Sequence, residues 1–177
     1  MNKQELSHQL KIHHKEFTDY LVNLNDADFM FALNGQKWTS GQQLEHIIMS
    51  VSPLVKAFRL PNFVLSMLFG KANRPTRSYE ELVAKYHSKL EAGGVAPTRF
   101  SPALIGVEQK VSEKNKLEKL VEKLCRQLNE LSESDLDKYI LPHPLLGKVT
   151  LREMFYFTIY HVQHHLGIAK RNLADRK

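Results

Sequence analysis

TLREMFYFTIYHVQHHLGIAKRNL, residues 150–173, carries the clearest secondary-structure signal in the chain. Thr150 stands three residues before Glu153, which is the spacing of a capping box at the start of a helix. The residues that would share one helical face follow at intervals of three and four, and they are Leu151, Phe155, Thr158, His161, Val162, His165, Ile168 and Leu173. This spacing predicts one long helix that buries a continuous face.

The rest of the chain predicts further helices joined by two long connections. Helical periodicity covers residues 2–24, 40–58, 61–69, 112–131 and the stretch from Ser78 to the Gly93-Gly94 stop. Pro53 is expected to bend the helix that it interrupts. Residues 95–107 and 132–148 contain Pro and Gly without a helical period, and no segment shows the alternation of a strand. We therefore predict an all-α fold, a four-helix bundle with long crossover connections.

The composition is that of a globular protein. A chain of 177 residues with 42% hydrophobic content can bury one core, so we expect a single domain over residues 1–177. Cys125 is the only cysteine, which excludes an intrachain disulfide and fits a reducing cytoplasm. The N-terminus has no apolar signal core, and no apolar run approaches the ~20 residues that a membrane span needs. We expect a cytoplasmic protein without a membrane segment.

The net charge of +6 raises the question of nucleic-acid binding. Basic and acidic residues are interleaved over residues 113–123, so no basic stripe forms there. The dense basic run over residues 170–177 lies at the C-terminal end of the last predicted helix, where positive charge is favourable anyway. The pattern argues against a nucleic-acid partner.

His161 and His165 are four residues apart in the last predicted helix, so both imidazoles project from one face about one turn apart. Two imidazoles placed in this way can chelate one divalent ion. The pair lies in line with Leu151 and Ile168, which directs it toward the interior. His164 is displaced by ~100° from His165 and is expected to face solvent or to support the ligands. The alternative interpretation is a pair of partly buried histidines that hydrogen-bond to their neighbours.

A third ligand has to come from another helix, and His46 is the candidate. At ~100° per residue, His46 lies off the centre of the stripe formed by Leu44, Ile48 and Val51. Its own strip has small residues such as Ser50, so another helix can approach it closely. An exposed surface histidine explains the same position equally well.

Four residues are candidates to support the ligands, because a ligating imidazole usually donates its other N–H to a carboxylate, a carbonyl or water. They are Glu45, Glu153, His143 and His164. Each has a simpler interpretation: Glu153 caps the helix, Glu45 lies on the surface, and His143 belongs to a Pro-rich connection. No residue is assigned as a general acid or base.

Three windows of the sequence together resemble a known family. They are WTSGQQLEHI (residues 38–47), HPLLGKVTL (residues 143–151) and HVQHHLGI (residues 161–168). A Trp and a Gln before a first His, followed much later by an HxxxH pair, are typical of the DinB-like (YfiT-like) superfamily of metal-dependent enzymes. The resemblance departs at one point, because Ile47, Ile48 and Met49 stand where members often carry an acidic residue.

The resemblance implies a three-His site for a divalent ion, nickel or zinc, made by His46, His161 and His165. It also implies a homodimer and a small-molecule substrate, with a low-molecular-weight thiol as one class. Thiol-dependent transfer and hydrolysis are the reactions to expect. The alternative is a non-catalytic dimeric bundle in which the histidines are vestigial.

Overall fold

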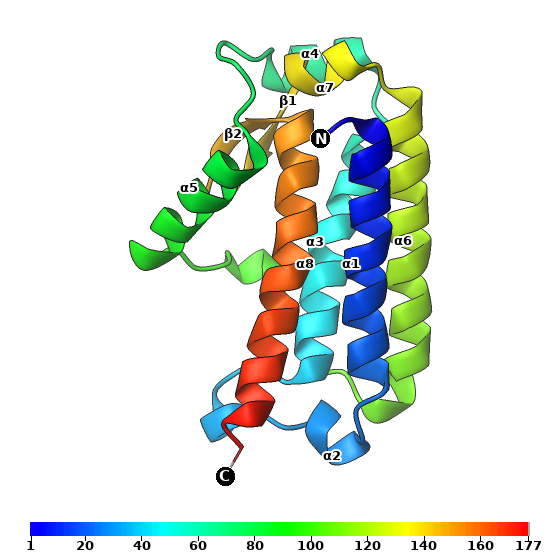
Figure 1. The fold of residues 1–177 in the computed structure, drawn as a ribbon, viewed down its shortest axis with the longest axis vertical. Helices are drawn as coiled ribbons and strands as arrows, with labels where there is room; N and C mark the ends of the chain where they lie inside the picture. Colours follow the sequence, from blue (N-terminus) through cyan, green and yellow to red (C-terminus); the bar gives the residue numbers. More distant parts are fainter. Residues whose placement is uncertain (177) are drawn as a thin grey trace.

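Four long helices lie side by side in the computed structural model, which describes residues 1–176 (Figure 1). They are α1 (Lys3–Val22), α3 (Ser40–Ala57), α6 (Lys110–Glu130) and α8 (Leu151–Ala174). In Figure 1 α1 and α8 run downward, whereas α3 and α6 run upward. Both α1 and α3 pack against α6 and against α8. The connection from α3 to α6 therefore has to bring the chain back along the length of the helices.

The remaining elements are short and lie in the connections. They are α2 (Asp26–Phe29), η1 (Leu33–Gly35), α4 (Asn62–Phe69), α5 (Tyr79–Glu91), η2 (Thr98–Phe100), η3 (Val107–Gln109) and α7 (Glu133–Lys138). The helix α5 packs against α8 on the outside of the four long helices (Figure 1). Helix dominates the secondary structure, which confirms the predicted all-α class.

A β-hairpin stands where the sequence predicted an irregular connection without strands. The strands β1 (Ile140–His143) and β2 (Gly147–Thr150) pair antiparallel, with Ile140 opposite Thr150 and His143 opposite Gly147. Each strand has only four residues, too few for a clear alternation. Pro142 is tolerated because both strands of a two-stranded sheet are edge strands. The prediction of no strand was therefore wrong.

The helix α8 is surrounded by other elements, which explains its composition. It packs against α1, α3, α5 and α7 and against both strands. The nine residues from Leu151 to Ile159 are all buried, so the first half of α8 is apolar around most of its circumference. The largest side chains that are fully buried are aromatic, namely Phe17, Phe29 and Phe155.

The buried carboxylate of Glu153 fixes the start of α8. It accepts the Thr150 amide and so closes the predicted capping box, and its side chain is 0% exposed. The Arg74 guanidinium donates to both of its oxygens, at 2.6 and 2.7 Å, and the Arg77 amide donates at 2.8 Å. Burial opposes ionisation of Glu153, but these donors outweigh it and hold the carboxyl pKa below its usual value. The connection between α4 and α5 is thereby tied to α8.

Within residues 1–176, no single helix is both long and apolar enough to cross a membrane. The bent pair Ser40–Ala57 and Asn62–Phe69, which meet at 111°, passes that test by length and composition alone.

Candidate metal centre

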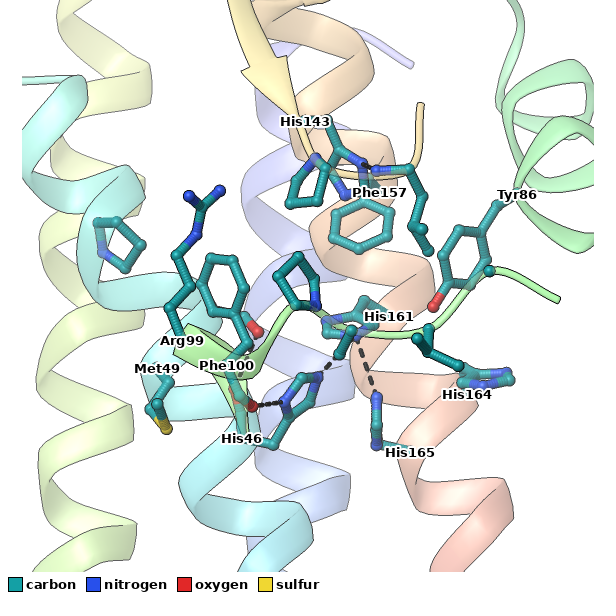
Figure 2. Close-up of a pocket in the computed structure, with 18 of the residues that line it drawn as sticks. His46, Met49, Tyr86, Arg99, Phe100, His143, Phe157, His161, His164 and His165 are labelled. Atoms are coloured by element: carbon teal, nitrogen blue, oxygen red, sulfur yellow. Dashed lines mark hydrogen bonds between the residues drawn. The ribbon is translucent and has the colours of Figure 1, made fainter. Parts of the chain in front are cut away.

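Two capped helices bring the predicted histidines to one place. Thr39 and Gln42 form the predicted capping box at the start of α3, and this sets the register that carries His46. The box of Thr150 and Glu153 does the same for α8, which carries His161 and His165. Since α3 packs against α8, the three imidazoles meet between these helices (Figure 2).

The three imidazoles converge through their Nε2 atoms. The Nε2 of His161 lies 3.3 Å from that of His46 and 3.0 Å from that of His165. All three residues are buried, with 3%, 6% and 6% of their surfaces exposed for His46, His161 and His165. The sequence left open whether His46 was a surface residue, and the structure places it inside against the other two.

Hydrogen bonds on the outer side of the cluster fix the tautomers of two rings. His46 Nδ1 lies 2.8 Å from the carbonyl oxygen of Phe100, and His165 Nδ1 lies 2.5 Å from Oε1 of Gln43. Both partners are acceptors, so each Nδ1 carries the proton and each Nε2 keeps a lone pair. Those two lone pairs point at the Nε2 of His161. A proton on that atom can satisfy only one of them.

This arrangement fits a divalent metal ion. Two ligand nitrogens of a tetrahedral zinc site are about 3.3 Å apart when each Zn–N bond is ~2.0–2.1 Å, and the observed separations of 3.0 and 3.3 Å are close to that value. Imidazole nitrogens are suitable ligands for zinc and nickel. A single ion would accept all three lone pairs, which one proton does not.

The ionisation of the cluster also suits a cation. Burial lowers the pKa of His46, and the hydrogen bond to Phe100 opposes this only in part. Burial, followed by repulsion from the neighbouring imidazoles, holds the pKa values of His161 and His165 well below the usual 6.5. All three rings are neutral at pH 7 and are able to act as ligands.

Comparison with protein families agrees with this geometry. The profile of the DinB superfamily matches residues 9–169, which include all three histidines. The chain belongs to the DinB superfamily. No curated protein shows significant similarity to it. Membership confirms the resemblance seen in the sequence. Of the three residues Ile47, Ile48 and Met49 that follow His46, Met49 lines the cavity described next.

A cavity of about 1000 Å³ opens beside the three histidines. Its walls are mostly apolar, with Trp38, Met49 and Phe157 among the lining side chains. The Trp38 ring centroid lies 4.9 Å from that of His46, and Phe157 stacks on His161 at 4.6 Å. These rings shield the imidazoles from water. Trp38 therefore forms part of the surroundings of the histidine cluster and is not only a packing residue of the core.

The four predicted supporting residues occupy different places. A carboxylate oxygen of Glu45 lies 3.9 Å from Nζ of Lys116 in α6. The Glu153 carboxylate pairs with Arg74 at the start of α8. His143 and His164 both line the cavity. The His164 ring centroid is 5.4 Å from that of His165.

His143 has the opposite tautomer from His46 and His165. Its Nδ1 accepts the amides of Leu145 and Leu146, at 3.2 and 3.1 Å, so its Nε2 carries the proton. Burial lowers its pKa to about 4, so the ring is neutral at pH 7. His143 therefore presents an N–H donor, not a ligand lone pair.

In the part of the chain that the structure describes, the hydrogen bonds to the outer sides of the ligand rings come from Gln43 and Phe100. Neither residue was assigned a supporting role from the sequence. Gln43 precedes His46 by three residues in the QQLEH segment, so its helical spacing was a usable signal. The Phe100 carbonyl is a backbone group in the connection from α5 to α6, and no side-chain pattern reports it.

Proposed function

We propose that this protein is a metal-dependent enzyme of the DinB kind, a four-helix bundle with long crossover connections. His46, His161 and His165 would hold one divalent ion, zinc or nickel. The observation that carries the proposal is the convergence of three buried Nε2 atoms, two of which are fixed as lone-pair donors from outside. Hydrogen-bonded imidazoles of this kind are typical of metal sites.

Three protein ligands leave a coordination position for another molecule, as in catalytic zinc sites. The ion would supply Lewis acidity and lower the pKa of a water or a thiol at that position. Gln43 and Phe100 hold two ligand rings in place, and Trp38 and Phe157 exclude water around them. The cavity of about 1000 Å³ has the size of a small-molecule site.

Hydrolysis and thiol-dependent transfer both suit such a centre. If a thiol takes part, it has to come from a substrate, because Cys125 is buried in α6 and its Sγ faces the Ser7 carbonyl of α1. Burial also raises the pKa of the Cys125 thiol, which disfavours the reactive thiolate. A low-molecular-weight thiol bound in the cavity is therefore one substrate class in the proposal.

Metal content and thermal stability test the proposal directly. Protein purified without a polyhistidine tag and without chelator should contain close to one equivalent of zinc or nickel. After chelation, zinc at about 100 times its Kd should stabilise the protein by ~2.7 kcal/mol, which for this size raises the Tm by roughly 5–10 °C. Magnesium is the control and should have no effect, because it prefers oxygen ligands.

A protein with far less than one equivalent of metal, and with a Tm that neither zinc nor nickel changes, would contradict the proposal. The histidines would then belong to a non-catalytic bundle.

A further inference from the structure

The charged side chains that line the cavity beside the three histidines are all positive. They are those of Lys37 and Arg99, and none of the described residues that line the cavity is Asp or Glu. The other ionisable groups of the wall are tyrosine and histidine. An anion entering this cavity meets no acidic side chain on the wall.

Lys37 and Arg99 are both exposed, and each stands next to a residue that touches the histidine cluster. Arg99 precedes Phe100, whose carbonyl accepts the hydrogen bond of His46, and its guanidinium lies 5.1 Å above the Phe100 ring. Lys37 precedes Trp38, whose ring packs against His46. Both cations are therefore sequence neighbours of residues that contact the histidine cluster, but neither cation belongs to the cluster.

Neither cation is paired with a carboxylate among residues 1–176. No carboxylate lies within 4.0 Å of the Lys37 ammonium or the Arg99 guanidinium, and neither group donates a hydrogen bond. Other arginines differ, since Arg74 and Arg152 are paired with carboxylates. Unpaired cations are common on a surface, but these two lie on the wall of a cavity where a ligand can reach them.

Apart from the two cations, the histidines and a few other polar groups, the wall is apolar. The side chains that form it include Met49, Pro53, Leu54, Val95, Pro97 and Leu141. In Figure 2, Arg99 and Met49 lie to the left of the histidine cluster, Tyr86 lies to its right, and His143 and Phe157 lie above it. A ligand with an apolar body and an acidic group would match both the apolar wall and the two cations.

We propose that the cavity binds an organic acid with an apolar body, a carboxylate or another monoanion, whose acidic group pairs with Arg99 and Lys37. This deepens the proposed function and rests on it for one point, namely that the other end of the ligand reaches the metal centre. The apolar walls supply affinity through burial, and the two cations select the charge and the orientation.

Calorimetric titration with octanoate and with 1-octanol tests this binding mode, because the two probes share an apolar chain and differ in charge. At low ionic strength, the wild type should bind octanoate about tenfold more tightly than 1-octanol, as expected for two exposed ion pairs. The double variant K37Q/R99Q should lose that advantage and bind the two probes equally. Added salt should weaken the binding of octanoate by the wild type but not that of 1-octanol.

The matched control is K123Q/R126Q, which removes the same charge from exposed positions of α6 outside the cavity. It should bind octanoate like the wild type. Equal binding of octanoate and 1-octanol by the wild type, failure to bind either probe, or wild-type octanoate binding by K37Q/R99Q would overturn the proposal.

Each titration is done on the protein as purified and again after chelation, which separates the two proposals. Octanoate binding that survives chelation and depends on Lys37 and Arg99 supports the acid site, even if no metal is ever found and the metal centre fails. Octanoate binding that disappears with the metal and ignores both cations would show that the carboxylate is only a metal ligand, which overturns the acid site.

Discussion

Replacing either His161 or His165 with alanine is expected to abolish tight zinc binding. Each supplies one of three converging Nε2 atoms, and two remaining imidazoles cannot complete the site. His46→Ala should have the same effect, because its ring completes the cluster from α3. We expect a loss of zinc affinity of at least about 100-fold for each variant, measured by competition with a chromophoric chelator.

The matched control is His164→Ala, which removes a neighbouring imidazole from the same helix. The His164 ring lies 5.4 Å from His165, centroid to centroid, and is not among the residues whose ligand atoms converge. Its zinc affinity should stay within a few-fold of the wild type. If His164→Ala strips the metal while His165→Ala retains it, the ligands are His161 and His164 and the assignment is wrong.

Glu153→Ala is expected to lower the free energy of unfolding more than the loss of any exposed ion pair would. It removes a fully buried carboxylate that accepts from Arg74, Arg77 and the Thr150 amide. Breaking a buried ion pair from one side costs about 3–5 kcal/mol. Because both arginines keep some contact with water, we expect the lower end, about 3 kcal/mol, which corresponds to a Tm lower by roughly 6–12 °C.

Glu118→Ala is the control for that variant. Glu118 lies on α6 with 40% of its side chain exposed, and its partner Lys114 is 3.7 Å away. An exposed pair of this kind contributes at most about 0.5 kcal/mol. Chemical denaturation of both variants gives the comparison, and equal free energies of unfolding would show that Glu153 does not anchor α8.

The parts of the fold that sequence could predict are those with local causes. The capping boxes at Thr39 and Thr150 fix where α3 and α8 begin, and both are read from residues three apart. The spacing of His161 and His165 likewise places them on one face of one helix. These local signals were sufficient to predict the four long helices and two of the three clustered histidines, but not α7, which lies in a connection predicted to be irregular.

The rest depends on tertiary contacts that no local pattern contains. Whether His46 faces α8 or solvent depends on the angle at which α3 packs, so the sequence left both alternatives open. The Phe100 carbonyl reaches His46 across 54 positions of sequence. The hairpin of β1 and β2 was missed because four-residue strands with Pro142 carry almost no periodicity.

X-ray absorption at the zinc edge of the wild type, loaded with one equivalent after chelation, tests the metal centre most directly. The convergence of His46, His161 and His165 predicts a first shell with three imidazole nitrogens at ~2.0–2.1 Å, with the multiple scattering that imidazole rings produce. A shell of oxygen or sulfur atoms without imidazole scattering, or zinc that washes away before the measurement, would contradict a three-histidine metal site.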